Sequence, residues 1–250
     1  METTLSVLIV SHGHGALLED LLESLQIQSI PEKFDIHLVL NLKEPPATLE
    51  KIQNCPIPIN LIQREQPKSL SKNLNDGISK TQSPFLLILN PDVTLPEDNL
   101  QNSLEFARLS GADLFTCPST DMQGTAQVNV RFFPTPHSLL WPRLTSEKSR
   151  ELEQNSIFEE RNEHPFWLQG SYLFGPTSTF QEFLFDERFP LYFEDVDLCR
   201  RLCQEGRKIK VCRQSSYFHH FLRKSRIPFS RHFFLHLYSA LLYFGKHGLS

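Results

Sequence analysis

Long hydrophobic runs and targeting signals are missing from this chain. No stretch of about 18 uninterrupted apolar residues occurs in its 250 residues, so we expect no transmembrane helix. The N-terminus carries no basic segment, and its apolar stretch, residues 5–10, is too short for a signal peptide. The sequence therefore predicts a cytoplasmic protein.

Cysteine is scarce and shows no metal-binding spacing. The five cysteines form no CxxC pair and their number is odd, so a disulfide framework is not expected. Cys199 and Cys203 lie one helical turn apart with Cys212 beyond them, but no fourth ligand accompanies them, which argues against a zinc site. Together with Cys55 and Cys117, they are predicted to be reduced, buried thiols.

Acidic residues are almost absent from the C-terminal fifth. From Arg200 to the end, eleven Lys and Arg residues stand against one acid, Glu205. Such a surplus suggests a phosphate-rich partner or an anionic membrane surface, although it could also simply balance the acidic body. No base-stacking motif or known DNA-binding pattern accompanies the charge, so nucleic acid is not a predicted partner.

The sequence does contain a regular alternation of strand and helix patterns. Leucines at i, i+3, i+4 and i+7 spacing mark an amphipathic helix directly after the first apolar strand. The order predicts one α/β domain, residues 1–250, with a Rossmann-like, mixed but mostly parallel central sheet flanked by helices. Strands are expected at 5–10, 35–40, 57–62, 85–89 and 112–117, and helices at 16–26, 69–80 and 96–109. Residues 123–133 suggest a hairpin, and residues 135–163 a mobile loop over the site.

A first acidic site follows the most apolar of these strands. Residues 85–89 are uniformly apolar, as in a strand buried on both faces, and Pro91 ends the strand. Asp92 therefore lies just past the carboxyl end of a buried strand, where open α/β sheets bind ligands. A strand-ending Asp can also be a simple turn former or helix cap. Paired with a second acidic site, Asp92 becomes a candidate metal ligand.

That second site is the run Glu194, Asp195 and Asp197. It lies between the apolar residues 191–193 and a basic, helix-friendly segment. Burial of neighbouring like charges raises at least one pKa, which is how a general base is made. The alternative is a helix start whose acids complement the helix dipole.

Six segments, in order, resemble family 2 glycosyltransferases of the GT-A fold, and most closely their bacterial rhamnosyltransferase-type members. LSVLIVSHGHGALLEDLLESLQIQ resembles the opening strand and helix of that family, and LLILNPDVTL its DxD metal motif with Asn in place of the first Asp. WLQGSYLF and FDERFPLYFEDVDLCRRLCQEGRKI resemble its acceptor and catalytic ED segments. HHFLRKS and RHFFLHLYSALLYFGKHG resemble its His-containing segment and closing amphipathic helix.

The resemblance implies roles for the acids and histidines. Asp92 would hold a divalent cation, Mn²⁺ or Mg²⁺, together with His219 or His220, and Asn90 would lie near the ribose or a metal-bound water. Asp195 matches the general base, and Glu194 would hold the acceptor or tune Asp195. These roles require Asp92 and Asp195 to converge on one cleft in the folded chain.

Further residues are implied to bind the two substrates. For the nucleotide-sugar donor they are Ser11, His12, Asn41, Lys72, Asn75, Asn90 and Asp92. Two departures from the family pattern concern the donor: Asn41 replaces the acid that ends the second strand, and Pro67-Lys68-Ser69-Leu70 replaces a glycine-rich loop. For the acceptor they are Trp167, Gln169, Gly170 and Asp197, with Asp197 also expected to cap the following helix and bind backbone or Arg.

The C-terminal segment carries an apolar stripe of Phe233, Leu237, Leu241 and Leu242. We favour core packing of this stripe onto the sheet. The alternative is peripheral contact with a membrane that carries a lipid-linked acceptor.

The resemblance implies an inverting, metal-dependent glycosyltransferase that uses a nucleoside-diphosphate sugar such as dTDP-rhamnose. It would extend a bacterial surface glycan such as a lipopolysaccharide O-antigen or capsular polysaccharide. Residues 1–117 would bind the donor, and residues 118–250 would bind the acceptor and supply the catalytic residues. A catalytically weak or inactive donor-binding scaffold subunit is the alternative, which the two departures favour. A metal-dependent nucleotidyltransferase would need a basic phosphate loop after the first strand, and SHGHGALLED contains no Lys or Arg.

Overall fold

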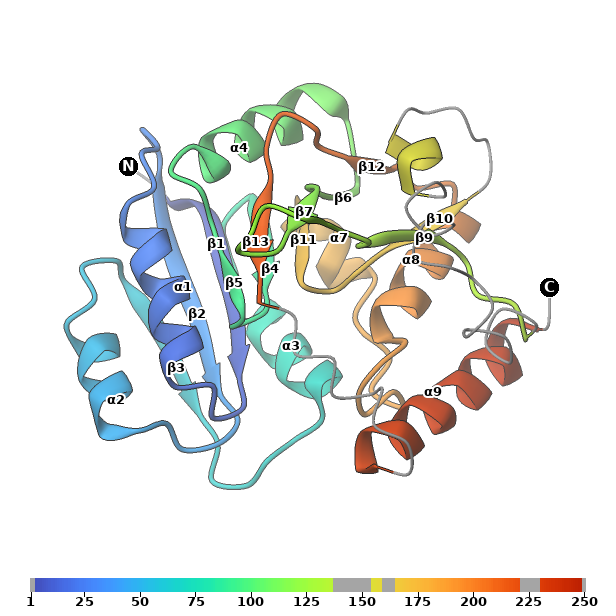
Figure 1. Ribbon diagram of the computed structural model, residues 1–250, viewed down its shortest axis with the longest axis horizontal. Coiled ribbons are helices and arrows are strands. Elements are labelled where there is room, and N and C mark those ends of the chain that lie inside the picture. The colour runs from blue at the N-terminus through green and yellow to red at the C-terminus, as the bar shows by residue number, and fades with distance from the viewer. Residues whose placement is uncertain (1–2, 137–153, 159–164, 221–229, 249–250) are drawn as a thin grey trace.

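A seven-stranded sheet forms the centre of the molecule (Figure 1). The computed structural model describes residues 3–136, 154–158, 165–220 and 230–248. All neighbouring strands run parallel except β11, which is antiparallel to both β4 and β6. The sheet order is β12 (Ile209–Val211), β6 (Leu114–Thr116), β11 (Tyr172–Pro176), β4 (Phe85–Leu89), β1 (Thr3–Ser11), β2 (Lys33–Leu40) and β3 (Ile59–Gln63). The predicted α/β fold with a mixed, mostly parallel sheet is confirmed.

Helices cover both faces of this sheet because the central strands are apolar on both sides. Alternate residues of β1 point to opposite faces: Val7 and Ile9 belong to one apolar cluster, and Leu8 and Val10 to the other. The first cluster includes α1 (Ala16–Gln26), α2 (Pro46–Gln53) and α4 (Asn99–Ser110). The second includes α3 (Leu70–Ile78), α7 (Thr177–Glu182) and α8 (Glu194–Gln204).

A smaller sheet extends past the carboxyl end of β4. It runs β5 (Val93–Thr94), β13 (Tyr217–His219), β7 (Ser119–Thr120) and β8 (Ala126–Gln127). The hairpin expected at 123–133 is wrong in its pairing: β7 pairs with β8, while β9 (Val130–Phe132) pairs with β10 (Phe166–Leu168).

Only part of the loop expected at 135–163 lies within the described residues, since 137–153 and 159–164 fall outside them. Residues 154–158 are helical, and Gln154 is 4% exposed. The Gln154 Oε1 accepts hydrogen bonds from the backbone N–H groups of Asn129 and Val130, at 2.8 and 3.3 Å. This piece is therefore packed against the body rather than forming a free loop.

The last helix, α9 (Arg231–His247), packs against the start of α8 rather than onto the sheet (Figure 1). Its buried residues are Ser239, Ala240 and Tyr243, which meet the cluster containing Phe189 and Phe193. The favoured expectation that the stripe packs into the core is wrong for Phe233, Leu237 and Leu241, which are 38%, 48% and 66% exposed. Its fourth residue, Leu242, is partly buried against the Phe189 and Phe193 cluster. No helix in the described ranges is both long and apolar enough to span a bilayer.

Candidate active site

Asp92 lies at the carboxyl end of β4, as the sequence predicts. The backbone N–H of His220 donates to the carbonyl oxygen of Asp92 at 2.9 Å, and β13 pairs with β5 at His219 and Val93. This pairing brings the Nε2 of His219 to 3.4 Å from the Oδ1 of Asp92. Burial alone would raise the pKa of Asp92, but the hydrogen bond and charge of His219 outweigh it and hold that pKa below its usual value.

The structure separates the two histidines that the sequence left as alternatives. The side chain of His219 faces Asp92 and is 2% exposed. The Nε2 of His220 is buried and makes no hydrogen bond within the described part of the chain. His219 is therefore the histidine that is paired with Asp92.

A carboxylate oxygen and an imidazole nitrogen are suitable ligands for Mn²⁺. Within the described ranges, no group of three or more His, Cys, Asp or Glu side chains is gathered as a ready cation cage. Asp92 and His219 therefore fit a cation as a two-residue protein site, whose other coordination positions would be taken by oxygen atoms of a bound ligand or water.

Glu194 and Asp195 form the first turn of α8, and the chain enters this helix under strain. Tyr192 and Phe193 have φ values of 68° and 65°, in the left-handed region that non-glycine residues rarely adopt. Phe193 is held there by the rings of His236 and Tyr243 of α9, with centroids 5.3 and 5.4 Å away. Strain that the surroundings enforce is typical of functional sites.

The two carboxyl groups have different surroundings. The Asp195 oxygens accept hydrogen bonds from the backbone N–H groups of Gly170 and Val196, both at 2.8 Å. The Oε2 of Glu194 is buried and has no hydrogen-bond partner within the described residues. Burial, and then the charge of Asp195, raises the pKa of Glu194 to about 8. Burial also raises the pKa of Asp195, against the opposing effect of the two N–H groups.

These surroundings divide the charge within the pair. A carboxyl group without a donor in contact is more stable when protonated, and one that accepts two N–H bonds is more stable when ionised. The surroundings therefore favour the proton on Glu194 and the negative charge on Asp195. An ionised carboxylate beside a neutral acid is suited to accept a proton from a hydroxyl group.

Hydrogen bonds connect the segments that carry the two acidic sites. The backbone N–H of Asn90 donates to the carbonyl oxygen of Ser171 at 3.1 Å, and Leu89 pairs with Tyr172. The next residue toward the N-terminus, Gly170, donates to Asp195. Both sites therefore lie at the carboxyl-end edge of β4.

At the ends of β1 and β2, the expected donor residues lie together. The Nδ2 of Asn41 lies 2.9 Å from both the Nδ1 of His12 and the carbonyl oxygen of Lys68, and the Oδ1 of Asn41 accepts from the Lys68 N–H at 2.8 Å. Asn41 thus fixes the loop that replaces the glycine-rich one. Its side-chain amide is engaged on both its donor and its acceptor side.

Glu44 is a part of this region that sequence reasoning missed. It is 2% exposed, and its carboxylate accepts hydrogen bonds from the Ser11 hydroxyl at 2.5 Å, the His14 N–H at 3.2 Å and the Gly15 N–H at 2.9 Å. It therefore fixes the turn between β1 and α1. The sequence did offer a signal, because Glu44 is an acid that follows the second strand by a few residues. The family pattern places its acid at the end of that strand, where this chain has Asn41.

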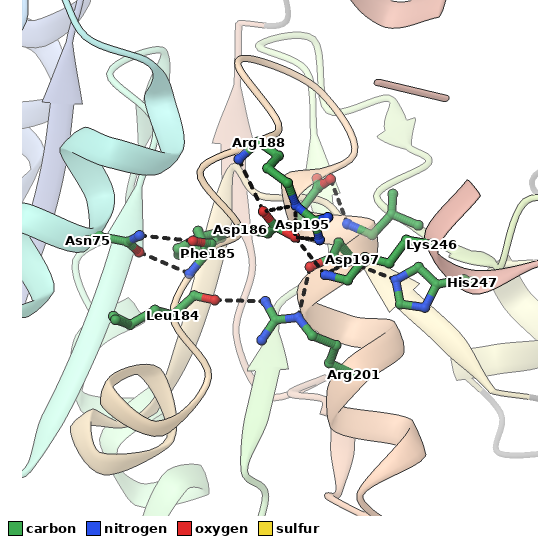
Figure 2. A network of polar contacts seen from close by, with 11 residues as sticks. Asn75, Leu184, Phe185, Asp186, Arg188, Asp195, Asp197, Arg201, Lys246 and His247 are labelled. Atoms are coloured by element: carbon green, nitrogen blue, oxygen red, sulfur yellow. Dashed lines mark hydrogen bonds and ion pairs between the residues drawn. The ribbon is translucent and has the colours of Figure 1, made fainter. Parts of the chain in front are cut away.

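The two residues expected on α3 have different surroundings. Lys72 forms ion pairs with Asp76 at 3.0 Å and Glu187 at 3.4 Å, and its side chain is 39% exposed. Asn75 exchanges two hydrogen bonds with the backbone of Phe185, both at 2.9 Å, and is 8% exposed (Figure 2). Asn75 joins α3 to the loop before α8, and both polar atoms of the amide expected at the donor are occupied by this backbone.

The residues expected at the acceptor are partly brought together. Gly170 contacts Asp195, and the backbone N–H of the adjacent Gln169 donates to the carbonyl oxygen of Asn129 at 2.9 Å. The Nε1 of Trp167 donates to the carbonyl oxygen of Phe132 at 3.1 Å, and its partly buried ring packs against the apolar clusters. Trp167 is therefore at least partly a core aromatic.

Asp197 lies in a network of cationic side chains between α8 and α9. It is fully buried, and its oxygens bind the Nε of Arg201 at 2.8 Å, the Nζ of Lys246 at 2.6 Å and the Nε2 of His247 at 2.7 Å (Figure 2). These contacts outweigh the effect of burial and hold the pKa of Asp197 below its usual value. The expected contact with Arg is present, but Asp197 joins α8 to α9, a role that distant sequence positions could not indicate.

The mixed α/β fold, with its mostly parallel central sheet flanked by helices, is shared with structural neighbours that are GT-A glycosyltransferases. The family model described as Glycosyl transferase family 2 matches residues 6–170. Because this match covers more than half of the chain, the protein belongs to glycosyl transferase family 2.

Individual relatives agree with this assignment. Rhamnosyltransferase WbbL of Escherichia coli (strain K12) is 24% identical over 251 residues, covering 96% of this chain and 92% of that protein. The crystal structure of S. aureus TarS matches with a TM-score of 0.65 at 17% identity, over 88% of this chain and 37% of that chain. The mannosyltransferase PcManGT from Pyrobaculum calidifontis, solved with GDP-Man and Mn²⁺, matches with a TM-score of 0.64 at 10% identity, over 90% of this chain and 59% of that chain.

Proposed function

We propose that the protein is an inverting glycosyltransferase that moves a sugar from a nucleoside-diphosphate sugar to a hydroxyl group of a bacterial surface glycan. The proposed sugar is rhamnose. The observation that carries this proposal is the position of Asp195, which accepts the Gly170 N–H at the edge of the sheet where Asp92 lies. Its neighbour Glu194 has a pKa raised to about 8 by burial and by the charge of Asp195. The likeness to a rhamnosyltransferase over nearly the whole chain supports the choice of sugar.

Asp195 is the general base of this proposal. It takes the proton of the acceptor hydroxyl as the oxygen attacks the anomeric carbon from the face opposite the diphosphate. One displacement needs one base and inverts the anomeric configuration. Glu194 stays protonated, so that it adds no second negative charge beside the base and can donate a hydrogen bond to the acceptor.

Asp92 and His219 would hold the divalent cation, Mn²⁺ or Mg²⁺. Once bound, the cation would stabilise the negative charge that develops on the departing diphosphate. The solved complex of PcManGT with GDP-Man and Mn²⁺ supports this part of the proposal at the level of the fold.

The remaining residues bind the two substrates. Ser11, His12 and Asn41 line the ends of the first two strands, with Lys72 and Asn90 toward the phosphates and ribose. Trp167, Gln169 and Gly170 bind the acceptor next to Asp195. In this division, residues 1–117 bind the donor and residues 118–250 the acceptor, and β11 and β12 from the second part complete the sheet of the first. The enzyme would work at the inner face of the cytoplasmic membrane on a glycan or lipid-linked glycan acceptor.

One observation favours the second candidate, a donor-binding scaffold subunit with little or no activity. The amide of Asn41 is already engaged by Lys68 and His12, so the usual contact to a nucleotide base would require these bonds to be exchanged.

Asp195→Asn separates the two candidates. A thermal-shift screen of nucleoside diphosphates and their sugars with Mn²⁺ identifies the donor, because ligand binding appears as stabilisation. Sugar transfer or slow donor hydrolysis is then measured for the wild type and the variant. The proposal predicts activity in the wild type and its loss in Asp195→Asn, with the ligand-induced shift retained. Stabilisation by a donor without any turnover in the wild type would favour the scaffold, and turnover by Asp195→Asn would reject the base.

A further inference from the structure

The outward side of α9 is apolar. Phe234, Leu237, Tyr238 and Leu241 are 55%, 48%, 54% and 66% exposed, while Ser239 and its neighbours fill the inward side. Between Arg231 and Lys246 the sequence contains no Lys, Arg, Asp or Glu. A surface helix of a globular protein normally carries charged and polar residues on its outer face. An apolar patch of this kind marks a surface that binds something.

The charge of the surrounding sequence indicates what covers this face. From residue 206 to 250 the chain contains nine Lys and Arg residues and no Asp or Glu. Four of the nine lie at positions 223, 224, 226 and 231, directly before or at the start of the helix. A second copy of the chain on the same face would bring another cationic helix start, that of Arg231, to the contact, which is unfavourable. An anionic lipid surface is complementary to both features, because it accepts apolar side chains and attracts the cations around them.

We propose that the outward face of α9 docks onto an anionic lipid bilayer, with Phe234, Leu237, Tyr238 and Leu241 entering the interface and α9 lying in the membrane plane. The surface itself follows from exposure and charge. Its use, to bring the enzyme to a lipid-linked acceptor, rests on the proposed function.

The contacts of α9 with α8 give this docking a consequence for the active site. The Nζ of Lys246 and the Nε2 of His247 bind Asp197, two residues after Asp195, and the Ser239 hydroxyl donates to the carbonyl oxygen of Leu191 at 2.8 Å. The helix that meets the bilayer is thus fixed to the start of the helix that carries the base (Figure 2). Docking therefore sets the position of Asp195 relative to the membrane.

Flotation with vesicles tests the proposal. The full chain and the double variant Leu237→Glu/Leu241→Glu are mixed with phosphatidylglycerol-containing vesicles or with neutral phosphatidylcholine vesicles. Leu109→Glu is the matched control, because Leu109 is an apolar residue of α4 that is 78% exposed and lies away from α9 (Figure 1). Circular dichroism checks folding, and the single variant Leu241→Glu replaces the double variant if the latter unfolds.

The proposal predicts that the wild type and Leu109→Glu float with anionic vesicles and much less with neutral ones. The double variant should lose at least about tenfold in partitioning, since two side chains no longer enter the interface. Equal flotation of the double variant, or no flotation of the wild type with anionic vesicles, would overturn it. So would a wild-type dimer that the double variant converts to a monomer in light scattering.

The same samples distinguish a failure of the docking surface from a failure of the proposed function. Nucleotide-induced thermal shifts are measured on each variant without vesicles. A double variant that keeps its nucleotide shift but fails to float supports the docking surface. If nucleotide-sugar binding and turnover are absent while the wild type still floats, the proposed function fails and the docking surface stands.

Discussion

The backbone N–H of Gly170 donates a 2.8 Å hydrogen bond to the Oδ2 of Asp195, joining the predicted acceptor segment to the predicted base. Glycine allows this approach: a Cβ at position 170 would lie 3.4 Å from the Cβ and the Oδ2 of Asp195, at the close end of ordinary contact. Because Gly170 has no side chain, it leaves the adjacent side of the Asp195 carboxylate uncovered.

Gly170→Ala should reduce transfer much more than stability. The added methyl group touches the Asp195 carboxylate without a severe clash, so folding is retained, but a small displacement of base or acceptor costs up to about a hundredfold in rate. Gly245→Ala is the control, because a Cβ there meets no atom within 4 Å. Steady-state transfer assays and melting temperatures measure both variants. A Gly170→Ala enzyme with wild-type kcat and acceptor KM would contradict the assigned geometry.

Glu194→Gln should change how stability depends on pH. The folded-state pKa of Glu194 is about 8, raised from about 4.5, so the folded state binds this proton more tightly than the unfolded state does. The resulting stability is fully present below about 4.5 and is lost as the pH rises toward 8. Denaturant titrations between pH 5 and 8 should show a fall for the wild type that is smaller in Glu194→Gln. Parallel curves would show that Glu194 is ionised in the folded protein.

Asp197→Asn should destabilise the fold by about 3 kcal/mol, because it leaves Lys246, Arg201 and His247 without their shared anion. The control, Glu23→Gln, removes a 61% exposed partner of Lys51 and should cost less than about 1 kcal/mol. Urea unfolding measures both. Equal stability of Asp197→Asn and the wild type would mean that this network does not hold α9 to α8.

His219→Gln should weaken Mn²⁺ binding at least about tenfold in the presence of a nucleoside diphosphate, since second-shell changes alone often cost that much. His220→Gln should have a smaller effect, because His220 contacts Asp92 through its backbone. Calorimetric titration of Mn²⁺ compares the two variants. A larger loss in His220→Gln would reverse the assignment.

Elements that depend on local pattern were predictable from the sequence. The leucine spacing predicted α1 at its observed bounds, Ala16–Gln26, and the apolar run predicted β4 and the turn at Asp92. The helix follows from its regular leucine spacing and the strand from its continuous apolar run. Both patterns depend only on residues that are close together in the sequence. The family followed from six segments in order, and the family match confirms it.

Partners distant in sequence were not predictable. Asn75 was expected to bind the donor, but the backbone of Phe185 occupies its amide. Asp197 was expected at the acceptor, but Lys246 and His247 bind its carboxylate. The stripe on α9 satisfied the pattern of a core helix equally well, because amphipathicity does not say which element, or which medium, covers the apolar side.

The structure of the protein with a nucleoside-diphosphate sugar and Mn²⁺ is the most direct test. The account predicts the cation on Asp92 and His219, and the anomeric carbon of the sugar facing the carboxylate of Asp195. A cation held elsewhere, or a donor whose anomeric carbon points away from Asp195, would contradict it.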